Sequence, residues 1–297
     1  MEELIQSMQN FLSGEPEMRY GELMEILNYS ENAQAMGALG LVLPACTEEE
    51  QYIISQKLGD DRLEGTVTFP PSLIQMFFAD ARIEAGPNAI SDLCCSLLSH
   101  HNQELRESML SLLEEGIFAL DEHTRCQLIL MLGDPEEKIR QLAANIIPLY
   151  SDDDLLPERF FSTFYLEDFR AGRFLAEELE THEDAVMFLY LCFAHSELGH
   201  LDKEDSLTPS ILIMELYHNA NRAKIDFSEA LSDALELFCA RSASLKQLSN
   251  KEKAMLKGGL KKGVRGAVEA SGGDFPKRLP RPNKQPLIRK EQAKAKA

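Results

Sequence analysis

The stretch LGDPEEKIRQLAANIIP at residues 132–148 constrains the fold of this chain more than any other part of it. Pro135 is predicted at a first helical position, where its missing N–H would have no helical partner anyway. Apolar residues then recur with the period of a helix, which predicts one buried face. The alanine pair would let another helix approach closely. The apolar positions are Ile139, Leu142, Ala143, Ile146 and Ile147, and the alanine pair is Ala143-Ala144.

The same pattern occurs 34 residues earlier in the chain. Ile139-Arg140 corresponds there to Leu105-Arg106, and Ala143-Ala144 corresponds to Met109-Leu110. A looser copy lies 30 residues downstream, where Phe169-Arg170 takes the Ile-Arg position but the alanine pair is missing. Repetition at a fixed period predicts a stack of similar helical hairpins. An irregular helical bundle with coincidental spacing is the alternative.

The stretch resembles the second helix of a HEAT repeat, in which an Asp-Pro start, a Val/Ile-Arg pair and an Ala pair recur. The resemblance covers about one helix, and it implies an all-α, HEAT-like solenoid of antiparallel helix pairs. Such folds bind partners more often than they catalyse reactions. Tetratricopeptide repeats also have this period, but their Trp, Gly and Tyr positions are not filled here. The residues that carry the resemblance are Asp134, Pro135, Ile139, Arg140, Ala143 and Ala144, with Leu105 and Arg106 in the echo.

The rest of the chain also reads as helices joined by short connections. Trp is absent and aromatic residues make up only 7% of the chain, which suits helix packing better than a β-sandwich. Residues 65–69 are the single strand candidate. Two capping boxes, Thr47-Glu50 and Ser249-Glu252, mark helix starts. The remaining helices are expected at about 2–12, 17–28, 30–43, 71–86, 88–98, 101–116, 121–132, 157–165, 167–181, 183–198, 208–220 and 228–245.

Charge divides the chain into an acidic body and a basic end. Residues 1–250 contain 16 Lys and Arg against 45 Asp and Glu, whereas residues 251–297 contain 14 against 4. We therefore predict an acidic helical repeat domain over 1–250, with a sub-boundary near 151–156 if the array is two-lobed. A basic amphipathic helix over 251–270 and a disordered Pro- and Lys-rich tail over 271–297 would follow.

The sequence leaves four possible roles open for the basic end. It could dock on the acidic body of its own or a neighbouring subunit, or bind nucleic acid without sequence preference by releasing counterions. It could also cap the last repeat through its Leu and Val stripe, or lie on a membrane surface. The candidate cations are Lys257, Lys261, Lys262, Arg265, Lys277, Arg278, Arg281, Lys284, Arg289 and Lys290.

Residues that could carry catalysis or hold a metal are present but weakly patterned. Two Glu-x-x-His pairs, Glu197/His200 and Glu215/His218, are the kind that di-iron helical bundles use, but nothing singles out the further glutamates such a site needs. Glu178 and Glu229 are nominal candidates for them. The pairs His100-His101 and His123/Cys126 lack the spacing of a zinc site or a nucleophile with its base, and a loop role is expected for the first pair. No cofactor is expected.

These features predict a cytoplasmic, non-catalytic scaffold or adaptor. Six cysteines without a CxxC pair suit reduced thiols, and the longest apolar run, residues 35–44, is too short to cross a bilayer. The expected working surface is an acidic groove of the solenoid that binds basic or amphipathic protein segments, with the tail docking electrostatically. The alternatives are a nucleic-acid-associated factor that uses the tail and, third, a helical metal enzyme. The sequence leaves the oligomeric state open.

Overall fold

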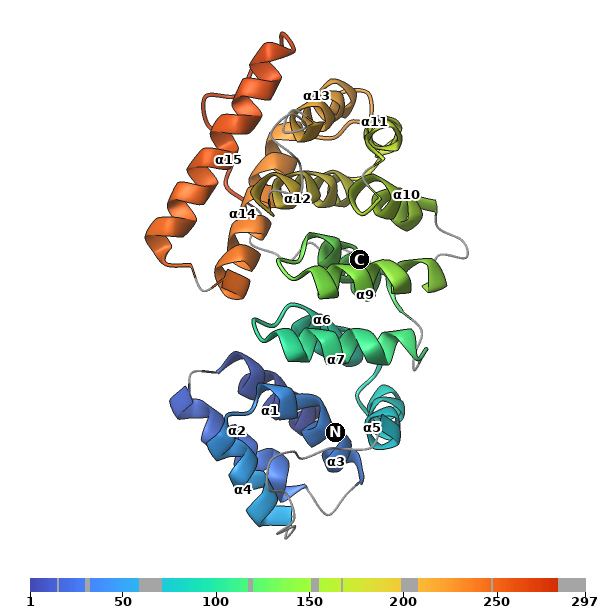
Figure 1. The fold of residues 1–297 in the computed structure, drawn as a ribbon, viewed down its shortest axis with the longest axis vertical. Coiled ribbons are helices and arrows are strands. Elements are labelled where there is room, and N and C mark those ends of the chain that lie inside the picture. The colour runs from blue at the N-terminus through green and yellow to red at the C-terminus, as the bar shows by residue number, and fades with distance from the viewer. Residues whose placement is uncertain are drawn as a thin grey trace, which may run out of the picture. The chain divides into compact units, whose positions relative to one another are not determined.

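The computed structural model describes residues 1–14, 16–29, 33–58, 71–116, 120–150, 155–166, 168–198, 208–246 and 248–282. Every regular element among these residues is a helix (Figure 1). The all-α class is therefore confirmed, while the strand candidate 65–69 lies outside the described residues.

The chain divides into two compact units, Met1–Gln127 and Leu128–Ala297. The division falls within α8 (Glu122–Leu130) and does not coincide with the sub-boundary predicted near 151–156. Unit 1 also holds α1 (Glu2–Ser13), α2 (Pro16–Asn28), α3 (Ala33–Val42), η1 (Leu43–Ala45), α4 (Glu48–Leu58), α5 (Pro71–Glu84), α6 (Pro87–Leu98) and α7 (Gln103–Glu114). Unit 2 holds η2 (Met131–Gly133), α9 (Glu137–Ile146), η3 (Ile147–Tyr150), α10 (Leu155–Phe164), α11 (Phe169–Glu178), α12 (His182–Leu198), α13 (Thr208–Ala220), α14 (Phe227–Lys246) and α15 (Asn250–Ala270).

Local capping signals set several helix starts. At α4, the Glu50 N–H donates to Thr47 Oγ1 at 3.2 Å, and the Thr47 N–H donates back to the Glu50 carboxylate at 2.8 Å. The reciprocal pair is also present at Ser249 and Glu252, where α15 begins. Both predicted capping boxes are therefore confirmed, because each depends only on residues three apart.

The start of α9 differs from its prediction. The helix begins at Glu137, two residues after Pro135, so the proline lies in the connection and not at the first helical position. The Asp134 carboxylate accepts the N–H of Glu136 at 3.0 Å and holds this connection in a turn. An Asp side chain that bonds to the backbone two residues on favours a turn over continued helix.

In unit 1, α3 and α5 pack against each other at very short range. A Cβ atom placed on Gly37 of α3 would lie 2.3 Å from the Leu73 carbonyl oxygen of α5 and 2.6 Å from the Phe77 Cβ atom. The glycine is therefore required by this crossing, since any side chain would push the two helices apart.

In unit 2, α12 is the central helix. Its residues from Ala185 to Ala194 are all buried, as expected of a helix that is apolar on every side. It packs against α14, and Gly133 of η2 approaches it closely: a Cβ atom there would lie 2.8 Å from the Ala194 Cβ atom. Gly133 of the repeat stretch thus serves the packing of η2 on α12.

The chain turns back after α15, and residues 271–282 run beside that helix (Figure 1). We call residues 271–282 the strap. Gly272, at φ 79°, makes the turn, and the Gly273 N–H donates to the Val268 carbonyl oxygen at 2.9 Å. The strap then packs on α13 and α14, so the predicted disorder of the tail does not hold for this part of it. Residues 283–297 lie outside the described residues.

Candidate functional site

The two copies of the 34-residue pattern contain the same buried arginine contact. In unit 1, Arg106 Nη1 donates to the carbonyl oxygens of His100 at 2.8 Å and of His101 at 3.0 Å. In unit 2, Arg140 Nη1 donates to the corresponding carbonyl oxygens of Asp134 at 2.6 Å and Pro135 at 3.0 Å. Each arginine therefore ties the connection before a helix to the first turn of that helix. The equivalence found in the sequence extends to single hydrogen bonds.

The apolar positions of the two copies are also equivalent. Ile139, Ala143 and Ala144 are buried, and so are their counterparts Leu105, Met109 and Leu110. The looser downstream copy differs, because Arg170 is exposed where Arg106 and Arg140 are buried. We therefore find the arginine contact in two copies of the pattern and not in the third.

Arg140 is internal, and its hydrogen bonds are made to the main chain. Its Nη1 atom donates to the carbonyl oxygens of Asp134 and Pro135, while the charges of Glu137 and Asp134 favour its protonated form. The Asp134 carboxylate is fully buried and lies 3.6 Å from Nη2 of Arg241 on α14. A buried carboxylate needs a charged partner, and here the partner comes from a distant helix.

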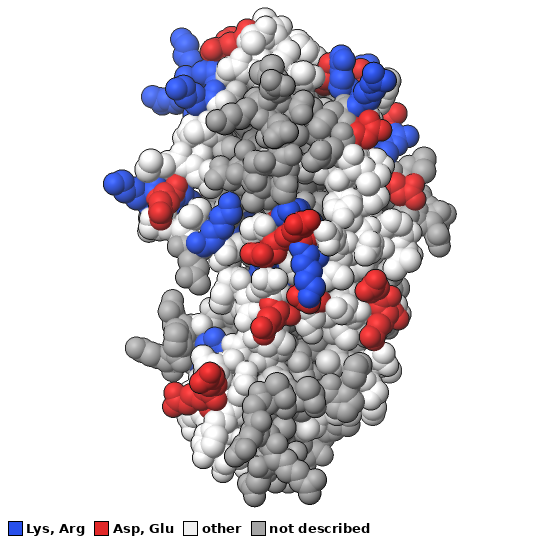
Figure 2. Space-filling view, viewed as in Figure 1, with Lys and Arg blue, Asp and Glu red and all other residues white. Residues whose placement is uncertain are grey.

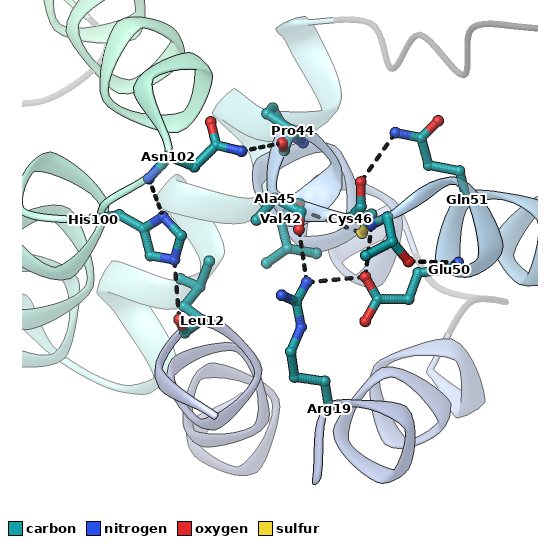
Figure 3. Close-up of polar contacts among 11 residues, drawn as sticks. Leu12, Arg19, Val42, Pro44, Ala45, Cys46, Glu50, Gln51, His100 and Asn102 are labelled. Carbon is teal, nitrogen blue, oxygen red and sulfur yellow. Dashed lines mark hydrogen bonds and ion pairs between the residues drawn. The ribbon is translucent and has the colours of Figure 1, made fainter. Parts of the chain in front are cut away.

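A connected polar cluster in unit 1 surrounds His100 (Figure 3). The Asn102 N–H donates to His100 Nδ1 at 3.0 Å, so Nδ1 carries no proton, and Nε2 donates to the Leu12 carbonyl oxygen at 3.0 Å. The Asn102 side chain donates to the Pro44 carbonyl oxygen at 2.8 Å and caps α7 by accepting the N–H of Glu104 at 2.8 Å. The ring thus joins the end of α1 to the start of α7.

The same close-up shows Arg19 of α2 holding the start of α4 (Figure 3). Its Nη2 atom donates to the Ala45 carbonyl oxygen at 2.7 Å and to the Glu50 carboxylate at 2.9 Å, and its guanidinium lies 4.3 Å from the Phe11 ring centroid. These contacts join four segments of unit 1. They bind side chains and main chain of the same unit to one another, which is the geometry of a structural cluster.

Burial lowers the pKa of His100 to about 4, with a smaller contribution from neighbouring His101. The ring is therefore neutral near pH 7, in agreement with an Nδ1 atom that accepts a hydrogen bond. The loop position predicted for His100-His101 is confirmed. Among the cysteines, burial raises the pKa of the Cys46 thiol to about 12 and also raises that of Cys94, so these thiols are not activated nucleophiles.

Seven of the ten candidate cations of the basic end lie on α15 and the strap. Lys257 donates to the Glu236 carboxylate of α14 at 2.5 Å, and Lys261 is half-buried. Lys262 and Arg265 are exposed. The Arg265 guanidinium lies 5.1 Å from the ring centroid of Phe275, which connects the helix to the strap.

The strap carries three more exposed cations, Lys277, Arg278 and Arg281. Its backbone is fixed by the Asp274 N–H, which donates to the Tyr217 hydroxyl at 3.1 Å, and by the Ser232 hydroxyl, which donates to the Pro280 carbonyl oxygen at 2.8 Å. Blue side chains gather on the left in Figure 2, over α15. The cationic surface, as we use the term, consists of Lys262, Arg265, Lys277, Arg278 and Arg281. Lys284, Arg289 and Lys290 lie outside the described residues.

The residues nominated for metal binding lie only partly within the described part of the chain. No group of three or more His, Cys, Asp or Glu side chains that could hold a metal ion occurs in the part of the chain that the structure describes. Glu178 pairs with Arg159, and Glu215 accepts hydrogen bonds from Arg173. Neither the Glu197 side chain nor His200 is among the described atoms.

Three contributors to these sites were missed by sequence reasoning: Arg241, Tyr217 and Ser232. Each acts on a residue more than 40 positions away, and none belongs to a local motif. The buried Phe275, which is 6% exposed, was the available signal. A lone aromatic residue two positions after a glycine pair favours a chain that turns and packs.

Comparisons with known proteins leave the family open. No family model, no curated protein and no solved structure matches this chain. Within the described residues, we find no helix with both the length and the apolar character needed to span a membrane.

Proposed function

We propose that this protein is a non-catalytic scaffold or adaptor of the HEAT-like type, which binds an anionic partner through the cationic surface of unit 2. The observation that carries the proposal is the set of five exposed Lys and Arg side chains on α15 and the strap. None of the five forms an ion pair with any described residue, in contrast to Lys257 beside Glu236. Unpaired cations on adjoining elements attract anions from solution.

The strap supports this proposal because it fixes cations that a free tail would leave dispersed. Its contacts with Tyr217, Ser232 and Arg265 hold Lys277, Arg278 and Arg281 beside those of the helix. A preorganised surface loses less conformational freedom on binding than a disordered one does. The fixed arrangement therefore favours recognition over mere solubilisation.

Retention of the full-length protein on heparin, a sulfated polyanion, tests the proposal. The variant Lys262→Gln/Arg278→Gln/Arg281→Gln should elute at clearly lower salt than the natural protein. The matched variant Lys57→Gln/Arg82→Gln/Lys138→Gln loses the same charge at exposed positions elsewhere and should elute with the natural protein. Equal losses for both variants, or no retention at 50 mM salt, would show that this surface is not a binding site.

A second candidate function rests on unit 1, and it retains the prediction that the acidic body binds basic or amphipathic segments. Residues 1–127 contain 22 Asp and Glu against 6 Lys and Arg. Three large side chains are well exposed there, Met18 at 67%, Tyr20 at 57% and Tyr52 at 63%. Met and Tyr are common at protein interfaces. Binding of a basic amphipathic peptide, weakened by Glu25→Gln/Glu48→Gln/Glu49→Gln, would support this function.

A further inference from the structure

We propose that the anionic partner is the sugar–phosphate backbone of a nucleic-acid duplex, bound without sequence preference. This inference rests on the proposed function and adds the class of partner. Three properties of the cationic surface carry it: an open face of glycines, the scarcity of apolar anchors, and aromatic rings that are covered by the protein itself.

The exposed side of α15 is unusually bare. A Cβ atom placed on Gly258, Gly259, Gly263 or Gly266 would meet nothing within 4 Å. At 100° per residue, the last three lie within about 60° of one another around the helix, beside Lys262. Over residues 259–266, a rigid polymer backbone can therefore lie close to the helix, while the cations at its flank reach the phosphates. The exposed Met255 lies on the same side, one turn before Gly259.

The surface lacks the anchors on which a protein partner would depend. Among the described residues of α15 and the strap, Met255 is the one large apolar side chain that is highly exposed, at 68%. Protein interfaces draw most of their binding energy from a few buried aromatic, Arg or large apolar residues. Here the attraction must come mainly from charge, and a duplex carries one charge per roughly 1.7 Å of its axis.

The aromatic rings near the surface cannot stack on bases. Phe275 is buried, with Arg265 over its ring. The half-buried Tyr217 ring lies between Phe227, at 5.2 Å between centroids, and Gly273 of the strap, where a Cβ atom would lie 2.4 Å from Tyr217 Cε1. Single strands are held mainly by bases stacked on exposed aromatic rings, whereas a duplex can be held by its phosphates alone. The arrangement therefore favours a duplex over a single strand.

The acidic remainder of the chain weakens this attraction without cancelling it. Charges separated by more than about 8 Å are largely screened at physiological salt. Glu236 of α14 is paired with Lys257, and Glu252 is occupied in the capping box. Glu269 of α15 and Asp274 of the strap are exposed, so the five cations exceed these two carboxylates by three charges. The surface thus keeps a local positive charge, and binding should weaken steeply as salt rises.

Fluorescence anisotropy with the full-length protein tests the inference, using a labelled 30-base-pair duplex, a labelled 30-nucleotide single strand and labelled poly-glutamate. We expect the duplex to bind at least fivefold more tightly than the other two. If all five cations contact phosphates, log K should fall against log salt with a slope of about −4.5. The variant Lys262→Gln/Arg278→Gln/Arg281→Gln should reduce that slope by about 3 units, and Lys57→Gln/Arg82→Gln/Lys138→Gln should leave it unchanged. Circular dichroism of each variant verifies that it is folded.

The outcomes separate this inference from the function on which it rests. If poly-glutamate or the single strand binds as tightly as the duplex, the duplex inference is wrong and the anion-binding function stands. If no polyanion binds, heparin included, both are wrong. If the duplex does not bind but sedimentation shows salt-sensitive self-association that the triple variant abolishes, the partner is the acidic surface of a second copy.

Discussion

His100 shows how a single buried side chain makes the stability of unit 1 depend on pH. Its two ring nitrogens are both used, one accepting from Asn102 and the other donating to Leu12, and this arrangement requires the neutral ring. Protonation would replace the acceptor with a donor facing another donor. The fold therefore favours the neutral form, in agreement with the lowered pKa of His100.

The predicted consequence is a loss of stability as pH falls from about 6.5 to about 4. With a folded-state pKa of about 4, below the usual 6.5, the unfolded chain binds the proton first, so the stabilising contribution is complete above 6.5 and declines below it. One group contributes a slope of at most about 1.4 kcal/mol per pH unit. Urea unfolding between pH 7 and 4.5 should show a shallower decline for His100→Gln. Parallel declines would contradict this role, because the carboxylates are the same in both proteins.

The paired arginines make a second prediction at this scale. Arg106→Lys and Arg140→Lys should each lower the free energy of unfolding by about 1–3 kcal/mol, because an ammonium group cannot reproduce the planar contact with two carbonyl oxygens. Arg170→Lys, at the exposed position of the looser copy, should change it by less than about 0.5 kcal/mol. Chemical denaturation measures all three, and equal effects at the three positions would show that the copies are not distinguished by this contact.

At the scale of the element, α15 is a helix with intrinsically poor helix formers on its open side. Each glycine in a helix interior costs about 1 kcal/mol relative to alanine. The helix is nonetheless fixed, because Val264, Ala267 and Val268 are buried and the capping box holds its start. Tertiary packing therefore compensates for low propensity, and the bare face remains available.

Alanine at Gly258, Gly259, Gly263 and Gly266 should stabilise the protein, by up to about 1 kcal/mol at each position. The added Cβ atoms would not clash with any neighbouring atom, since nothing lies within 4 Å of them, so the gain in helix propensity is not offset. Thermal unfolding would show it as a higher midpoint. Gly37→Ala is the contrasting control, because its Cβ atom would collide with α5, and it should lower the midpoint. A lower midpoint for the α15 variants would mean that the glycines pack against something.

The strap makes a separate prediction at the same scale. Phe275→Ala should release the strap, because it removes the buried ring that lies beneath Arg265. Hydrogen exchange at the Asp274 amide, which donates to Tyr217, should then accelerate at least tenfold, while exchange in α12 should not change. Phe275→Leu should restore most of the protection. An unchanged Asp274 amide would show that the ring does not hold the strap.

At the scale of the whole molecule, charge is distributed very unevenly between the two units. Residues 1–127 have 16 more acidic than basic residues, whereas residues 128–297 have only 3 more. The excess carboxylates of unit 1 therefore repel one another and destabilise the unit. Glu114 and Glu115 add to this, because both are exposed at the C-terminal end of α7, where the helix dipole is also negative.

Raising salt from 20 to 200 mM should therefore raise the unfolding midpoint of the whole protein, because it screens repulsion between the carboxylates. Glu114→Gln/Glu115→Gln should raise the midpoint at 20 mM and should reduce the response to salt. Calorimetry at both salt concentrations measures this. A midpoint that falls with salt would mean that attractive ion pairs outweigh the repulsion.

The sequence by itself determined the features that depend on near neighbours. Capping boxes, the proline start of α6 and the apolar stripe of α9 involve residues one to four positions apart, so the printed chain contains all that they require. The 34-residue equivalence between the two copies was also visible in the sequence, because both helices bury the same pattern of positions and place an arginine at the same distance from the preceding connection. The sequence likewise contains the candidate cations of the basic end, but not their arrangement, and their role in binding stays a prediction.

Only the tertiary structure decided which distant groups meet. The Asp134 carboxylate pairs with Arg241, Arg140 turns to main-chain carbonyl oxygens, and the strap folds onto α13 and α14. Each outcome depends on helices that pack from far along the chain, and local propensity contains no information about them. A buried charge pairs with whichever group the packed core places near it, and that group is near only after the core has formed.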